Sequence, residues 1–233
     1  MQIYLMRHAI AADLGDGPWK RDAERPLTKE GIRRTHRAAE GLVSAGVVFD
    51  AILSSPLVRA RETAGIVAEV LEDATPSTRR GKAPGARGGE EHHGRAHGGD
   101  DRAAPAVLLT DALAPGLHLD ELYRLVRRAA GLQKARQEPA RPAAGGIAGH
   151  RTDRSAGTAG KERDAEHEAR ILLVGHEPDM GWLAAHLLGL PGGHSLPFKK
   201  GAIARIDLEQ LPPVSPGRLV WMLTAPLAAK LGS

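Results

Sequence analysis

The segment "QIYLMRH", residues 2–8, is a short apolar run that ends in an arginine and a histidine. Its length and its Ile, Tyr and Leu content are typical of a buried β-strand. Arg7 and His8 both prefer water or an anion, so this strand end is a candidate binding element. In open α/β sheets, ligands bind beyond the C-terminal ends of the parallel strands. Other strands of this chain that end in similar groups would contribute to the same site.

Further apolar runs of strand length follow, and segments with helical periodicity separate most of them. The expected strands are residues 2–8, 51–55, 106–110, 171–176, 202–208 and 219–224, and the expected helices are residues 28–46, 55–72, 118–131 and 179–189. This alternation predicts an α/β fold, a three-layer α/β/α sandwich with a mostly parallel central sheet. Since the last two strands follow each other without a helix, at least one of them is expected to form an antiparallel edge.

Two segments, residues 75–104 and 133–169, are low in complexity and rich in Gly, Ala, Arg, Glu and His. They contain too few large apolar residues to offset the entropy of ordering, so we expect disordered insertions within a single domain that spans residues 1–233. The two segments supply three of the four net positive charges of the chain and contain no Phe, Tyr or Trp. Without aromatic side chains to stack on bases, their basic character does not indicate a nucleic-acid partner.

The composition excludes several classes of protein. The chain has no cysteine, which excludes disulfides, thiolate metal sites and phosphatases with a cysteine nucleophile. No apolar run approaches the roughly 18 residues of a membrane span, and the first apolar run is too short for a signal peptide. We expect a cytoplasmic, monomeric protein that does not bind membranes.

Three strand ends carry groups suited to one anion site. The first strand ends in Arg7 and His8, the second leads into a helix with Arg59 in its first turn, and the fourth ends in His176 shortly before another helix. If these ends converge, the pocket contains two guanidinium groups, two imidazoles and at least one helix N-terminus. Such a pocket suits a dianion, most simply a phosphoryl group.

A metal site is the competing interpretation. His8 and His176 could act as ligands together with Asp13 or Asp111. However, two nearby guanidinium charges raise the energy of a metal dication, whereas they lower that of a phosphate. The arginines therefore favour the phosphoryl site.

The positive surroundings also indicate a mechanism. Nearby like charge disfavours the imidazolium form, so we expect a neutral His8 with one nitrogen free to attack phosphorus and the other bonded to a backbone carbonyl. Arg7, Arg59 and His176 would bind the equatorial oxygens of the transferred group. The product of this step would be a phosphohistidine enzyme, which water then hydrolyses.

Five blocks in this order, "LMRHAIA", "RPLTKEG", "SSPLVRARETA", "LLVGHEPDMGWLA" and "GAIARIDL", resemble the histidine phosphatase superfamily with its phosphoglycerate mutase-like fold. They are most similar to the SixA-type phosphohistidine phosphatase branch. The resemblance implies that His8 is the nucleophile, that Arg7 and Arg59 bind phosphate, and that His176 is the second catalytic histidine. It also implies no metal or organic cofactor, and a histidine-phosphorylated signalling protein, such as a phosphotransfer domain, as partner.

Two positions depart from the wider superfamily. Ala9 stands where the widespread motif has glycine. Alanine is acceptable at this position if its backbone torsion φ is negative. The following "AIAADLGD" lacks the pattern of the mutases, which counts against a mutase.

Arg25 either reaches the rim of the pocket or pairs on the surface with Glu24 or Asp22.

The sequence leaves the identity of the general acid open. Asp111, Glu177 and Asp13 are candidates, and the resemblance to the SixA branch implies that a dedicated acid is dispensable. Glu177 is also well placed to cap the helix expected to begin at Pro178.

Three other functions compete with a phosphohistidine phosphatase. The first is a small-molecule phosphomonoesterase acting on sugar or nucleotide phosphates with the same residues. The second is a non-catalytic phosphoprotein-binding module. The third is a nucleic-acid-binding protein acting through the basic insertions.

Overall fold

The structure is a computed structural model that describes residues 1–74, 105–137 and 168–231. The expectation of disorder for residues 75–104 and for most of 133–169 lies outside this part of the chain. One boundary of that expectation was wrong. Residues 133–137 continue the helix Leu119–Gln137, because this stretch contains good helix formers and the helix tolerates Gly131, where we expected it to end.

The centre of the fold is a six-stranded sheet in the order β3-β2-β4-β1-β5-β6. The strands are β1 (Gln2–Arg7), β2 (Ala51–Ser54), β3 (Val107–Leu109), β4 (Arg170–Gly175), β5 (Ile203–Asp207) and β6 (Arg218–Leu223). The first four are parallel to one another, β5 is antiparallel to β1, and β6 is antiparallel to β5. This confirms the mostly parallel sheet with an antiparallel edge.

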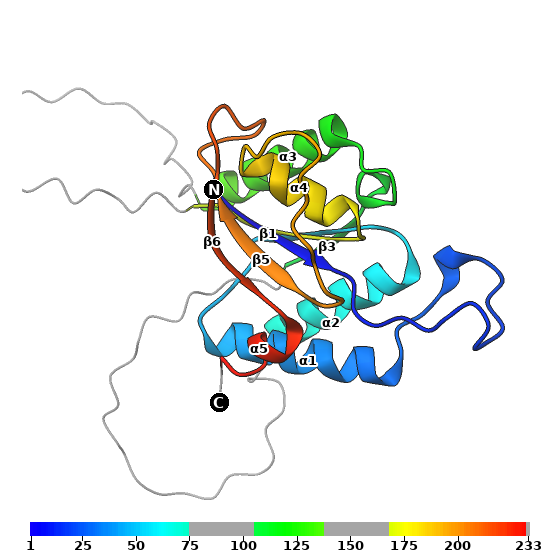
Figure 1. Cartoon of the computed structure of the whole chain (residues 1–233). Coiled ribbons are helices and arrows are strands. Elements are labelled where there is room, and N and C mark those ends of the chain that lie inside the picture. Colours follow the sequence, from blue (N-terminus) through cyan, green and yellow to red (C-terminus); the bar gives the residue numbers. More distant parts are fainter. Residues whose placement is uncertain (75–104, 138–167, 232–233) are drawn as a thin grey trace, which may run out of the picture.

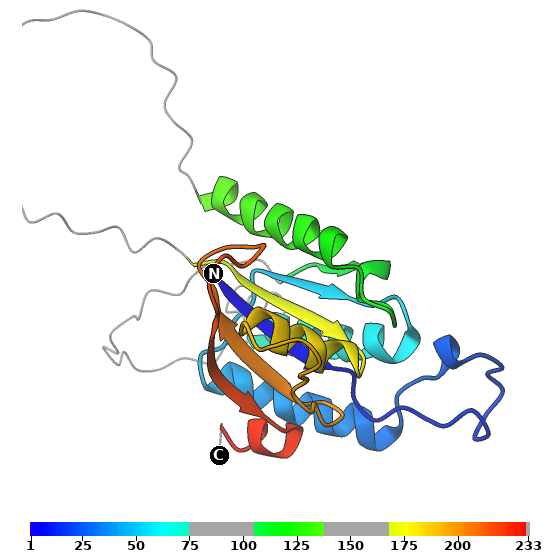
Figure 2. The same ribbon diagram turned by 45° about the horizontal axis from the view of Figure 1, so that its top comes forward.

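Helices cover both faces of the sheet, so the three-layer sandwich is confirmed (Figures 1 and 2). The helices are α1 (Lys29–Ser44), α2 (Val58–Ala74), α3 (Leu119–Gln137), α4 (Asp179–Leu187) and the short α5 (Ala225–Ala228), with single turns η1 (Asp22–Glu24) and η3 (Asp111–Leu113). Alternation along β1 sends Ile3 and Leu5 into the core beneath α3 and α4, and Tyr4 and Met6 into the core beneath α1 and α2. Within the described residues, we find no helix with the length and apolar character that crossing a bilayer requires.

Two helix starts position the site. Thr28 caps α1 as predicted, because its Oγ1 accepts a hydrogen bond from the backbone N–H of Gly31 at 3.0 Å. The helix expected over residues 55–72 begins later, at Val58, but Arg59 still lies in its first turn. The side chain of Arg59 therefore starts close to the end of β2.

The contact between α1 and α5 depends on a glycine. A Cβ at Gly41 would lie 2.0 Å from the carbonyl oxygen of Ala228, which is backbone and cannot rotate away. We expect Gly41→Ala to lower the free energy of unfolding by about 1–3 kcal/mol in urea titrations. The control is Gly65→Ala on α2, where nothing lies within 4 Å of the new Cβ and a gain of about 0.5–1 kcal/mol is expected. An equal response of both variants would mean that α5 does not pack on Gly41.

Candidate active site

The parallel register of β1, β4 and β2 brings the C-terminal ends of these strands together at one edge of the sheet. The long loop after β1 leaves from the same edge (Figure 1). Arg7 is the last residue of β1, His8 follows it, and His176 follows β4. Arg59 reaches the same place from α2, so the structure brings together the four residues that the sequence predicted.

The hydrogen bonds of His8 define its tautomer. Its Nδ1 lies 2.7 Å from the carbonyl oxygen of Ala9, which can only accept, so Nδ1 carries the hydrogen. On the other side of the ring, Arg59 Nε–H donates to His8 Nε2 at 3.2 Å. Nε2 therefore has a lone pair. The backbone N–H of Ala9 donates to Thr63 Oγ1 at 3.1 Å, which ties the residue after His8 to α2.

Both imidazoles are buried and close together, with ring centroids 5.1 Å apart. Burial is the main cause that lowers the pKa of His8 to about 3, and the positive charges of Arg59 and Arg7 lower it further. Burial likewise lowers the pKa of His176 to about 4, followed by the charge of Arg59. The expected neutral His8 is found, but desolvation contributes more to it than the neighbouring charges on which the prediction relied.

These pKa values predict an acid-sensitive fold. The unfolded chain binds protons on both imidazoles near pH 6.5, whereas the folded chain resists protonation until about pH 4 for His176 and about pH 3 for His8. The free energy of unfolding should be fully present above pH 6.5 and fall by up to about 1.4 kcal/mol per pH unit for each imidazole as the pH drops toward 4. Urea titrations of wild type and His8→Gln across this range check it: the variant should show the shallower slope, and equal slopes would contradict the assignment.

His176 is held by a serine that the sequence analysis did not assign to the site. The Nε2 atom of His176 lies 2.8 Å from Ser55 Oγ, and Ser55 follows β2 directly. The other ring nitrogen, Nδ1, is buried and has no hydrogen-bond partner among the described residues. The Ser55 hydroxyl can therefore orient the imidazole while Nδ1 is available to another group.

Arg7 is anchored by the loop before β5. Its Nη1 donates to the carbonyl oxygen of Phe198 at 2.8 Å, and the N–H of Phe198 donates to Glu177 Oε1 at 2.6 Å. The Nε atom of Arg7 is buried and, within the described residues, has no partner. The alternative role of Glu177 as a helix cap was wrong: Pro178 occupies the N-cap of α4, and the Glu177 carboxylate holds the loop that contacts Arg7.

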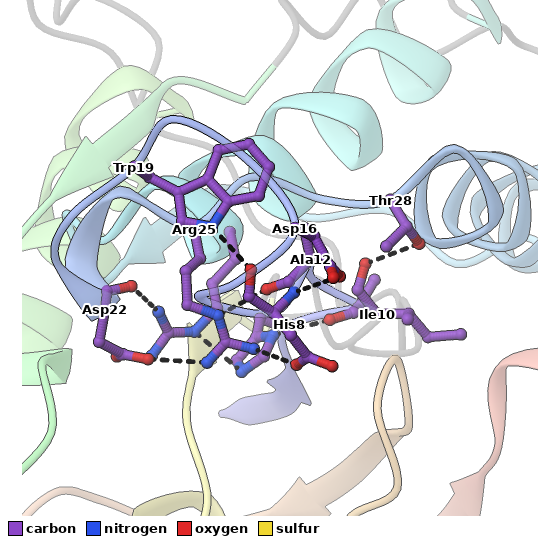
Figure 3. A network of polar contacts seen from close by, with 11 residues as sticks. His8, Ile10, Ala12, Asp16, Trp19, Asp22, Arg25 and Thr28 are labelled. Carbon is purple, nitrogen blue, oxygen red and sulfur yellow. Dashed lines mark hydrogen bonds and ion pairs between the residues drawn. The ribbon is translucent and has the colours of Figure 1, made fainter.

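The loop after β1 contributes a polar network around His8 (Figure 3). Arg59 donates from Nη1 to the carbonyl oxygen of Asp22 at 2.7 Å and from Nη2 to its carboxylate at 2.8 Å. Arg25 donates to the other oxygen of the same carboxylate at 2.8 Å. Arg25 thus reaches the rim of the site through Asp22, whereas Glu24, its other possible partner, pairs with Arg21.

The remaining acid candidates differ in position. Asp13 pairs with Arg25 at 3.1 Å and is exposed. Asp111 is also exposed, in the first position of η3, and within the described residues its carboxylate makes no hydrogen bond or ion pair. The structure therefore links neither carboxylate to His8 directly. Among the described residues, no three His, Asp or Glu side chains cluster in a way that could hold a metal ion.

The fold and the site define an α/β protein whose parallel strands end in a cluster of two imidazoles and two guanidinium groups. Residues 3–81 match the model of the histidine phosphatase superfamily (branch 1). This match contains Arg7, His8 and Arg59, while His176 lies outside it. The match is confined to this N-terminal part of the chain, and the fold of the described residues is similar to that of a solved protein histidine phosphatase.

Several solved structures share this fold at low sequence identity. A structure of the protein histidine phosphatase SixA complexed with tungstate is 19% identical, with a TM-score of 0.58 and coverage of 97% of this chain and 98% of that one. A protein from Agrobacterium tumefaciens assigned as SixA has a TM-score of 0.51 at 19% identity, with coverage of 96% of this chain and 97% of that one. A protein from Escherichia coli assigned as an alpha-ribazole-5'-P phosphatase also gives 0.51 at 19% identity, covering 97% and 98%. At this identity the likeness concerns the fold.

A curated relative is an uncharacterized protein of Picosynechococcus sp. It is 44% identical over 84 residues, which amount to 36% of this chain and 50% of the relative. The chain thus spans about half the length of the curated relative that it matches.

Proposed function

We propose that this protein is a phosphatase that forms a covalent phosphohistidine at His8 and that it acts on histidine-phosphorylated proteins. The observation that supports it most is the state of the His8 ring. Its tautomer is fixed by Ala9, its Nε2 lone pair faces the guanidinium of Arg59, and its pKa lies far below neutral. A neutral, oriented imidazole beside a cation is what nucleophilic attack on a phosphoryl group requires.

The proposed reaction has two steps. The Nε2 lone pair of His8 forms a bond to phosphorus while the bond from phosphorus to the leaving group breaks. Arg59 Nε–H, which now donates to Nε2, shifts to a phosphoryl oxygen as the N–P bond forms. The leaving group takes a proton from solvent. Water then attacks phosphorus and loses a proton to solvent while the bond between phosphorus and Nε2 breaks, which releases phosphate and returns the lone pair to Nε2.

Two buried groups would gain partners from a bound phosphoryl group. Arg7 Nε and His176 Nδ1 have no hydrogen-bond partner within the described residues, and a buried polar atom without a partner is costly. When Ser55 donates to Nε2 of His176, the Nδ1–H is free to donate to an oxyanion. Phosphoryl oxygens beside His8 would supply acceptors for both groups.

The carboxylates around the site favour a phosphoramidate substrate. Asp22 accepts from two arginines, Asp13 pairs with Arg25, and Glu177 accepts from a backbone N–H. Within the described residues, neither these three carboxylates nor the exposed one of Asp111 hydrogen-bonds to His8. An alkoxide leaving group needs a positioned acid, whereas the imidazole of a phosphohistidine leaves readily once solvent has protonated it. The similarity in fold to structures named SixA agrees with this choice.

A side-by-side assay tests the substrate class. The rate of dephosphorylation of a histidine-phosphorylated phosphotransfer domain is compared with kcat/KM on a panel of sugar, nucleotide and ribazole phosphates. We expect the phosphohistidine protein to react fastest, and His8→Ala to be inactive on every substrate. Faster turnover of one ester would identify a small-molecule phosphatase, to which the E. coli fold relative points. Binding without turnover would identify a phosphoprotein-binding module.

A further inference from the structure

Asp22 connects Arg25 of the loop after β1 with Arg59 of α2. Figure 3 shows Asp22 beside Arg25. One oxygen of its carboxylate accepts from Arg59 Nη2 and the other from Arg25 Nη1, both at 2.8 Å. Its backbone carbonyl oxygen accepts a third hydrogen bond, from Arg59 Nη1 at 2.7 Å. The sequence predicted Asp22 only as a surface partner of Arg25, and none of the proposed reaction steps above uses it.

These contacts form a closed ring that includes the proposed nucleophile, His8. Arg59 Nε donates to His8 Nε2 at 3.2 Å, and its other end is held by Asp22. Asp22 is held by Arg25, whose Nε donates to the carbonyl oxygen of Ala12 at 2.6 Å. Ala12 belongs to the same chain segment as His8 and is separated from it by three residues. The ring therefore fixes the guanidinium of Arg59 relative to the His8 imidazole from both ends.

The ring leaves donors for a substrate. A guanidinium has five N–H donors in one plane, and Arg59 donates three of them in these contacts. One N–H remains on each of Nη1 and Nη2, and the Nε–H becomes available when phosphorus bonds to His8. Because the guanidinium is planar, holding its Nη1 and Nη2 edge determines where all of these donors point.

The Asp22 carboxyl group is better suited to accept hydrogen bonds than to act as a general acid. The hydrogen bond from Arg25, and then that from Arg59, hold the pKa of the Asp22 carboxyl below its usual value. The carboxylate faces the Nη1 and Nη2 edge of Arg59, whereas His8 lies at Nε. Asp22 thus leaves the side of Arg59 that faces the nucleophile open.

We propose that Asp22 is a positioning residue of the phosphoryl-transfer site, with Arg25 as its anchor: it holds the guanidinium of Arg59 in the orientation in which it donates to a phosphoryl group on His8. This inference rests on the proposed function of the site. Asp22 acts through Arg59 and does not itself contact the reacting atoms.

The test compares Asp22→Ala and Asp22→Asn with a matched control. Asp207 also bridges two arginines, Arg205 and Arg218, but it pairs with Gln2 at the opposite end of β1. We expect Asp22→Ala to lower kcat/KM by about 10- to 100-fold through a fall in kcat as well as a rise in KM. Its affinity for inorganic phosphate, measured by calorimetry, should fall too. For Asp22→Asn, which keeps one acceptor oxygen on the side chain, both values should lie between those of Asp22→Ala and wild type. Asp207→Ala should change neither kcat/KM nor phosphate affinity.

Phosphate affinity separates this proposal from the proposed function. If wild type binds phosphate without turnover and Asp22→Ala binds it more weakly, the positioning role stands and the phosphatase proposal fails. A folded Asp22→Ala with unchanged kcat/KM and phosphate affinity would overturn the positioning role. Tighter phosphate binding with faster turnover would also overturn it, because Asp22 would then compete with the substrate. Should Asp22→Ala not fold, the same outcomes are read from Asp22→Asn and from Arg25→Gln, which removes only the anchor.

Discussion

His8→Ala is expected to lose phosphatase turnover by about 10³-fold or more, because the variant has no atom that can form the N–P bond. Within the described residues, His8 Nε2 is the one imidazole nitrogen that accepts a hydrogen bond from an arginine. The loss should appear in kcat and should not be recovered at high substrate concentration. Steady-state assays on a phosphohistidine protein measure it directly.

The control for this variant is His118→Ala. His118 is exposed and immediately precedes α3, so its removal should leave turnover unchanged. His8→Ala should retain a cooperative unfolding transition, since the two large hydrophobic clusters of the core do not include this ring. Turnover by a folded His8→Ala within tenfold of wild type would exclude this residue as the nucleophile.

Arg59→Ala is expected to lower kcat/KM by about 10²- to 10³-fold, because it removes the cation nearest to the point where charge develops on phosphorus. Arg59 contacts His8 Nε2 at 3.2 Å and is buried. Arg59→Lys keeps the charge but lacks the planar set of donors that reaches both His8 and Asp22. We therefore expect the lysine variant to recover only a small part of the lost activity.

Two measurements check the Arg59 variants. Steady-state kinetics give the loss in kcat/KM, and thermal unfolding shows whether the fold persists. Arg61→Ala is the control on the same helix, since Arg61 is exposed and points away from the buried face of α2. Full activity of Arg59→Lys would mean that charge alone matters and would contradict the role given to the guanidinium geometry.

The sequence predicted the sheet and the four central residues for identifiable reasons. Strand-length apolar runs with polar ends determine which residues emerge at the C-terminal edge of a parallel sheet, and Arg7, His8 and His176 are such residues. Arg59 was predicted because it comes shortly after the second strand, in the first turn of the next helix. The missing helix between residues 208 and 219 predicted that at least one of the last two strands is antiparallel, and β5 and β6 do pair in antiparallel fashion.

The roles of loop residues could not be predicted in the same way. Asp22 and Ser55 act through contacts with residues distant in the chain, Arg59 and His176, and no local periodicity encodes such contacts. Glu177 was placed at a helix start by local pattern, yet the loop around Phe198 takes its carboxylate. The spacing of Asp22 three residues before Arg25 was a visible signal, but surface pairing explained it equally well.

The most direct test is to identify the phosphorylated atom of the enzyme during turnover. Wild type is mixed with a phosphohistidine protein or with phosphoramidate, quenched in alkali within one turnover, and examined by mass spectrometry. We predict a base-stable, acid-labile phosphoryl group on His8 that is absent from His8→Gln. Turnover without any phosphoryl enzyme, or a phosphoryl group on another residue, would contradict the proposed chemistry.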